Sequence, residues 1–118
     1  MQDFKKLRVW EKAHALTVDI YLVSKRFPKD EMFGITSQVR RASSSIAANI
    51  AEGSGRTSKK EFLHFLSYAI ASASEIEYFL ILVKDLNYLS IEESERLQDR
   101  ANEVKRTLIS FLKTVASS

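Results

Sequence analysis

Two Glu-x-x-His pairs are the residues whose spacing best suits metal chemistry. They are Glu11 with His14, and Glu61 with His64. Carboxylate-bridged di-metal bundles use two such pairs, together with one Glu from each remaining helix. At about 100° per residue, however, all four side chains lie roughly 100° to 160° from the apolar stripe of their own helix. They therefore face outward, and we predict no metal site and no cofactor.

Nucleophilic catalysis has no better support in the sequence. Ser43, Ser44 and Ser45 stand together, but neither a sequence-evident His or Lys base nor a Gly-x-Ser-x-Gly elbow accompanies them. The AEGSGR segment contains a Gly-x-Gly, but it follows a helical pattern and not a strand, so it does not predict a nucleotide-binding loop. We therefore predict no catalytic residues and a protein that is not an enzyme.

Five basic residues are the candidates for binding a polyanion. They are Arg40, Arg41, Arg56, Lys59 and Lys60. The last three stand at the junction of two predicted helices, where the N-terminal end of the second helix adds its positive dipole. This corner could hold phosphate, and few aromatic residues interleave the charges. Any binding of RNA or DNA should therefore be directed at the backbone, sensitive to salt and weakly selective for sequence.

A polar row on the same predicted helix leaves two interpretations open. At helical spacing the row contains Gln38, Arg41, Ser45, Asn49, Glu52 and Arg56. It is either part of a phosphate-binding groove or a ladder of hydrogen bonds between subunits. The acidic Glu52 does not suit a phosphate groove, and it could pair with Arg41, with Arg56 or with a basic residue of a neighbouring subunit.

The net charge of +3 is unevenly distributed along the chain. Basic residues dominate positions 40–60, and acidic residues dominate positions 85–103. This separation predicts a basic end and an acidic end, which can attract a polyanion or bring two subunits together. Two solvated faces without a binding role are the alternative.

The composition favours helices in a single domain. The 118 residues include three Gly, one Pro and no Cys, and 45% are hydrophobic. This length suits one core, so we predict a single domain over residues 1–118. No run reaches the roughly 18 apolar residues of a membrane span, and no signal peptide opens the chain. We therefore expect a cytoplasmic protein without a membrane partner.

The apolar periodicity predicts four helices, at about residues 7–27, 35–53, 59–86 and 91–115. Pro28 ends the first helix, and the Gly53-Ser54-Gly55 cluster predicts a left-handed terminus for the second. Capping boxes predict the starts of the third and fourth helices, with Ser58 and Ser90 as N-caps. Short loops between these helices predict an all-α fold, the antiparallel up-down four-helix bundle.

Some apolar residues exceed what the core of one bundle requires. Trp10 and Tyr21 lie roughly 100° from the centre of the first helix's core stripe. The segment from Tyr78 to Val83, which includes Ile81, is apolar all round its helix. We expect a homo-oligomer to cover these residues, since large exposed apolar patches are rare on monomers. Absorption by loops or by a broad core is the alternative.

Three segments resemble a known family of bacterial four-helix bundle proteins, encoded in intervening sequences of 23S rRNA genes. They are FKKLRVWEKAHALTVDIY, GITSQVRRASSSIAANIAEGSGR and SKKEFLHFLSYAIASASEIE. The same family includes the accessory variability determinant protein of diversity-generating retroelements. The resemblance covers nearly the whole chain, and the block that ends in AEGSGR is its most specific part.

The resemblance implies a homopentameric barrel with no established enzymatic activity. For the retroelement branch it implies a positively charged surface that binds nucleic acid and a reverse transcriptase. The matched positions are Gln38, Arg40, Arg41, Asn49, Glu52, Gly53, Gly55 and Arg56. By this resemblance the two glycines belong to a turn, and the other positions belong to the polar face or to subunit contacts. A structural interaction module without nucleic acid is the alternative function.

Overall fold

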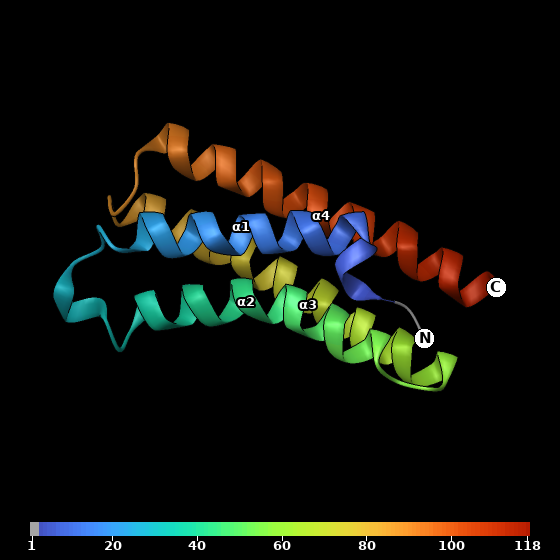
Figure 1. Ribbon diagram of the computed structural model, residues 1–118. Coiled ribbons are helices and arrows are strands. Elements are labelled where there is room, and N and C mark those ends of the chain that lie inside the picture. Colours follow the sequence, from blue (N-terminus) through green and yellow to red (C-terminus); the bar gives the residue numbers. More distant parts are fainter. Residues whose placement is uncertain (1–2) are drawn as a thin grey trace.

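Four α-helices form most of residues 3–118, the part of the chain that this computed structural model describes. They are α1 (Arg8–Ser24), α2 (Ile35–Ser54), α3 (Lys59–Asp85) and α4 (Ile91–Ser117). Two short 3-10 helices, η1 (Phe4–Lys6) and η2 (Lys29–Glu31), precede α1 and α2. Consecutive helices run antiparallel, and α1 also contacts α4, which closes an all-α up-down four-helix bundle (Figure 1).

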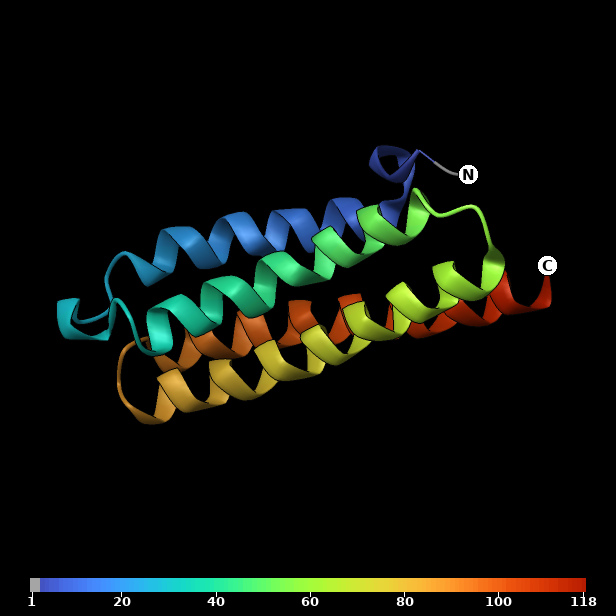
Figure 2. The same cartoon turned by 90° about the horizontal axis from the view of Figure 1, so that it is seen from below.

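The helices differ in length, and this leaves one end of the bundle uneven. α1 has 17 residues, whereas α3 and α4 have 27 each. At about 1.5 Å per residue, α4 is roughly 15 Å longer than α1. The η1 segment does not extend α1 along α4 but turns to lie beside the end of α2 (Figure 2).

The predicted core stripes are confirmed. The largest fully buried side chains come from all four helices, and they include Leu16, Ile46, Leu66 and Leu97. Small residues let the helices approach closely: Ser43 of α2 is fully buried, and its carbonyl accepts a 2.9 Å hydrogen bond from the Thr17 hydroxyl of α1. Core burial of these stripes is the main force that holds the bundle together.

Both predicted N-caps are confirmed. The Ser58 hydroxyl accepts the Glu61 N–H at 3.1 Å, and the Ser90 hydroxyl accepts the Glu93 N–H at the same distance. In a capping box the Glu side chain is expected to accept the backbone N–H of the N-cap residue, whereas here the Glu61 carboxylate accepts from the Ser58 hydroxyl at 3.2 Å. These caps satisfy N–H groups that have no partner within the helix.

The predicted left-handed terminus at Gly53-Ser54-Gly55 is wrong. Gly53 lies buried within α2 and does not form a turn, and Gly55 caps the helix with a φ of −84°. Asn87, in the loop after α3, has the positive φ instead, at 63°. The glycine at position 53 serves close packing, because an added Cβ would lie 2.8 Å from Cβ of Phe65. The first helix also ends earlier than expected, at Ser24, and a turn continues to Phe27.

α3 has the length and composition of a membrane span, which was not expected from the sequence. An 18-residue window of this helix has a mean hydropathy of 1.4. In the bundle its apolar stripe packs against α2 and α4, with Leu66, Ile76 and Leu80 almost fully buried.

Candidate nucleic-acid interface

A pocket of about 210 Å³ lies at the corner between α2 and α3. It is lined by Gly53, Ser54, Arg56, Thr57, Ser58, Lys59, Phe62, Val115 and Ser118. Two of the predicted phosphate-binding residues, Arg56 and Lys59, therefore line one cavity at the start of α3. Lys60 is exposed beside them.

The side chains at this corner already have partners. The Arg56 guanidinium lies 4.8 Å from the centre of the Phe65 ring, and it forms long ion pairs with Glu52, at 3.6 Å, and Glu61, at 3.8 Å. Lys59 Nζ donates to the carbonyl of Ser118 at 2.8 Å. The two carboxylates reduce the positive potential at the corner, although Arg56 keeps 41% of its side chain exposed.

The other two predicted cations lie elsewhere, so the five do not form one surface. About 15 residues of chain separate Arg41 from Arg56, roughly 20 Å along a helix. Arg40 Nε donates to the Ser24 hydroxyl at 2.8 Å, and its guanidinium stacks over Tyr21, so it braces α1 against α2. Arg41 lies in an open hollow of about 320 Å³ with Gln38, Ser45 and Glu75.

The polar row of α2 is in part an internal contact. The Ser45 hydroxyl hydrogen-bonds to the Ser72 hydroxyl of α3, and Asn49 Nδ2 donates to the Ser45 carbonyl at 2.7 Å. Gln38 and Glu52, by contrast, are exposed. The centre of the row thus contributes to the contact between α2 and α3 of one chain, while Gln38, Arg41, Glu52 and Arg56 are its exposed members.

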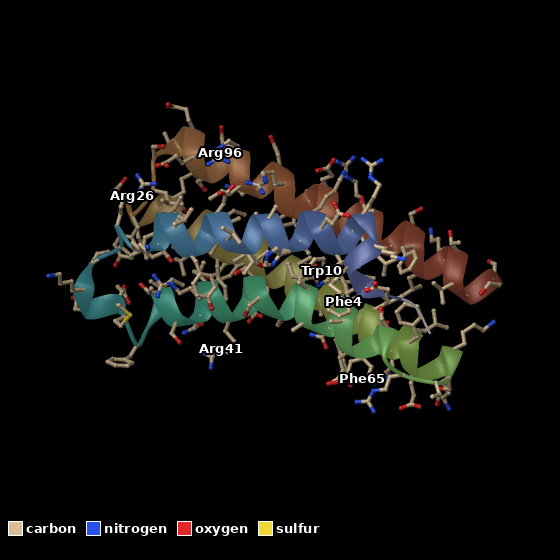
Figure 3. The ribbon with its side chains drawn as sticks, viewed as in Figure 1. Phe4, Trp10, Arg26, Arg41, Phe65 and Arg96 are labelled. Atoms are coloured by element: carbon tan, nitrogen blue, oxygen red, sulfur yellow. The ribbon has the colours of Figure 1, made fainter. Side chains whose placement is uncertain are left out.

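Both Glu-x-x-His pairs face outward, as the helical spacing predicts. All four side chains are exposed, and no group of three His, Asp or Glu residues gathers within residues 3–118. His14 stacks on Trp10 with ring centres 5.0 Å apart. The Phe4 ring meets the Trp10 ring edge-on, with ring centres 5.1 Å apart, and Figure 3 shows the two side by side. Trp10 is partly buried within its own chain, and its place on an oligomer surface stays a prediction.

Exposed apolar residues remain on α3 and α1. Tyr78 is 57% exposed and Ile81 is 42% exposed, while their neighbours Phe79, Leu80 and Val83 are buried in the core. Tyr21 is also exposed, under the Arg40 guanidinium. Within the 78–83 segment, Tyr78 and Ile81 are therefore the exposed side chains that could form the predicted oligomer surface.

Sequence reasoning missed the cations where α1 begins and in the second half of α4. Arg8 and Arg106 have no ion-pair partner within residues 3–118. A signal was present, because no Asp or Glu follows Glu103 in the sequence. The sequence does not show which helix packs beside the part of α4 that follows Glu103, because this depends on the tertiary structure.

Comparison with known proteins agrees with this fold. The family model described as 23S rRNA-intervening sequence protein matches residues 5–110. A crystal structure of a protein with unknown function, from the S23 ribosomal protein family of Bacteroides thetaiotaomicron, has 30% sequence identity and a TM-score of 0.83. The match covers 89% of this chain and 98% of that one. Among curated proteins, none matches.

Proposed function

The chain belongs to the family of 23S rRNA-intervening sequence proteins, and we propose that it is a non-enzymatic, cytoplasmic homo-oligomer that binds the phosphate backbone of RNA or DNA. The solved relative has no known function, so the proposal rests on the chemistry of this chain's surface. The family resemblance seen in the sequence supports two parts of this proposal: that the oligomer is a pentamer and that the protein has no catalytic activity.

The observation that carries the proposal is the corner pocket between α2 and α3. It combines Arg56 and Lys59 with the N-terminal end of a 27-residue helix. Both features favour an anion, and neither requires a particular base. Phosphate contacts position a nucleic acid without reading its sequence, so binding should be weakly selective.

A salt titration tests this function. Binding of a fluorescent mixed-sequence RNA or DNA should weaken steeply between about 50 and 200 mM salt, because each phosphate contact releases counterions. Replacing Arg56, Lys59 and Lys60 with Ala should lower the affinity without changing the oligomer. A matched triple variant, Lys25→Ala, Lys29→Ala and Lys84→Ala, removes the same charge elsewhere and should bind almost as tightly as the wild type. Absence of binding by the wild type at 50 mM salt would contradict the proposal.

A structural interaction module without nucleic acid is the second candidate function. The exposed Tyr78 and Ile81 favour it, because they offer apolar area to another subunit or protein. Stable oligomers together with no binding at low salt would select this alternative. A reverse transcriptase as partner, which the resemblance implies for one branch of the family, stays a prediction that co-purification of the two proteins would test.

A further inference from the structure

The seam between α1 and α4 carries a ladder of ion pairs. Its rungs join Arg26 to Glu93, Asp19 to Arg100, and Lys12 to Glu103. The α1 member of each rung is seven residues from the next, so all three lie on one flank of the helix. Each cation on one helix meets an acid on the other, and Lys12 Nζ lies 2.9 Å from Glu103 Oε2. Figure 3 shows Arg26 at the end of the seam where α4 begins.

The ladder has no acidic residue at the position that follows the Lys12–Glu103 pair. One turn before Lys12 on α1 is Arg8, and one turn after Glu103 on the antiparallel α4 is Thr107. No Asp or Glu follows Glu103 in the sequence. If the ladder is continued by one helical turn on each side, its next position therefore has a cation on α1 and only a hydroxyl on α4. Arg106 adds a second cation without an ion pair in the described part of the chain.

An open groove lies along this flank of α4. It has a volume of about 550 Å³ and is lined by Glu103, Arg106, Thr107, Ser110, Phe111 and Thr114. α4 continues past the start of α1 at this end of the bundle (Figure 1). The Ser110 hydroxyl makes no hydrogen bond to residues 3–118 and is free to donate to a ligand.

Helix stability does not explain the two cations. Arg8 is the first residue of α1, where the helix dipole disfavours positive charge. Arg106 lies well before the last turn of α4, so it cannot complement the dipole at that end. The one acid of the groove, Glu103, is already engaged, because the hydrogen bond from Lys12 lowers the pKa of its carboxyl. Arg106 also lowers the pKa of Glu103 through its charge, so this one carboxylate faces two cations, Lys12 and Arg106, and the groove keeps an excess of positive charge.

We propose that a phosphate group supplies the missing negative charge of this ladder, so that the groove beside Arg8, Arg106 and Ser110 binds the polynucleotide backbone. The inference rests on the proposed function and adds a second phosphate-binding surface to the α2–α3 corner. At the corner, two carboxylates pair with Arg56, whereas Arg106 forms no ion pair within residues 3–118, and the one carboxylate of its groove, Glu103, already pairs with Lys12.

The test measures fluorescence anisotropy of a labelled single-stranded 20-mer RNA of mixed sequence, with the full chain. The double variant Arg8→Ala, Arg106→Ala should raise the Kd at least tenfold at 50 mM salt. It should also reduce the slope of log K against log salt by roughly 1.4, about 0.7 for each lost phosphate contact. The control is Lys25→Ala, Lys29→Ala, which removes the same charge from exposed positions away from this groove and should change the Kd less than threefold. Equal losses in the two double variants would overturn the inference.

A second variant tests the missing acid directly. Thr107→Glu places a carboxylate in the groove beside Arg106, where it repels phosphate. The new side chain also stands one turn after Glu103, so the variant should fold with a stability within about 0.5 kcal/mol of the wild type and lose most of its RNA binding. Unchanged binding in this variant would overturn the inference. Wild-type protein that binds no RNA at 50 mM salt would refute the proposed function as well. Wild-type binding that is lost only in the Arg56, Lys59, Lys60 variant would refute this surface alone.

Discussion

Gly53 shows how a single missing side chain sets the distance between two helices. It lies within α2 at the point where this helix meets Phe62 and Phe65 of α3. A Cβ at this position would lie 3.0 Å from the Phe62 ring and closer still to Phe65. Close approach of the two helices is what requires glycine here, since no left-handed backbone is involved.

Gly53→Ala should therefore destabilise the protein. Overpacking costs about 1–3 kcal/mol, and the better helix propensity of Ala returns about 1 kcal/mol. Urea unfolding should show a net loss of about 1 kcal/mol. Gly55→Ala is the control, because its Cβ would have ordinary contacts at 3.5 Å and longer, and it should be neutral or stabilising by up to about 1 kcal/mol. A Gly53→Ala variant as stable as wild type would contradict the packing argument.

Tyr88 is held by a carboxylate from another loop. Its hydroxyl donates to Glu31 Oε2 at 2.7 Å, and this hydrogen bond raises the pKa of the Tyr88 phenol. A raised pKa in the folded state means that the stabilisation is fully present below the unfolded value of about 10. It is lost as the pH rises through the higher folded value.

We expect this tyrosine to ionise late in an alkaline titration followed by phenolate absorbance. Tyr88→Phe should remove the latest component of the titration. In Glu31→Gln the same phenol should ionise at lower pH, because the negative charge beside it is gone. A titration curve that is identical in wild type and Glu31→Gln would contradict the assignment.

At the scale of elements, α2 begins differently from α3 and α4. Its N-cap is Gly34, which has no side chain to accept an N–H. Glu31, from η2, supplies the acceptor instead, and its Oε1 receives the Ile35 N–H at 3.3 Å. Because its other oxygen binds Tyr88, this carboxylate ties the start of α2 to the loop between α3 and α4.

Glu31→Ala should lower the free energy of unfolding by about 1–2 kcal/mol, since it removes a charged acceptor from two donors and from a helix N-terminus. Ser58→Ala, which removes the cap of α3, should cost about 1 kcal/mol. The exposed neighbour Asp30 is the control, and Asp30→Ala should stay within about 0.5 kcal/mol of wild type. Equal urea midpoints for Glu31→Ala and Asp30→Ala would refute the capping role.

The α1–α4 ladder should make the bundle sensitive to acid. A side-chain hydrogen bond from Arg26 lowers the pKa of Glu93, and one from Lys12 lowers that of Glu103. Groups with a lowered folded pKa stabilise the protein above their unfolded value of about 4.3. This stabilisation disappears as the pH falls through the folded values.

Thermal unfolding should therefore give a nearly constant Tm at mildly acidic and neutral pH, and a falling Tm below about pH 4. The double variant Arg26→Gln, Lys12→Gln should show a shallower decline, since its carboxyls lose the partners that lower their pKa. Parallel declines in wild type and variant would show that other carboxyls control acid unfolding.

At the scale of the whole molecule, the bundle is a rod of 45 × 24 × 20 Å with exposed apolar side chains on its α3 side. Tyr78 and Ile81 are exposed outside the core, so we predict that they contact another subunit. Light scattering should give a multiple of the 13.5 kDa chain mass, with five copies as the resemblance implies.

Tyr78→Glu together with Ile81→Glu should dissociate this oligomer, because buried charge without a partner is costly. Lys25→Glu together with Lys29→Glu is the control. Both side chains are exposed and polar, so their replacement should leave the mass unchanged. A monomeric wild type would contradict the prediction that Tyr78 and Ile81 contact another subunit.

The sequence was sufficient for the features that depend on neighbours along the chain. Helix positions, core stripes and the caps at Ser58 and Ser90 follow from local spacing, because helical periodicity and capping act within a few residues. Helical spacing was also sufficient to predict that both Glu-x-x-His pairs face outward. Gly53 was misinterpreted because a glycine near a helix end also fits a left-handed terminus, and only the contact with Phe65 distinguishes the two roles.

Only the tertiary structure decided which charges are balanced. Arg56 meets two carboxylates at the corner, Arg40 braces α1 against α2, and Lys12 finds its acid 91 residues away in Glu103. Coulombic pairing acts through space and not along the chain, so a basic stretch in the sequence does not identify a basic surface. Arg8 and Arg106 are among the cations without an ion pair within residues 3–118, and the sequence alone does not show which of its cations these are.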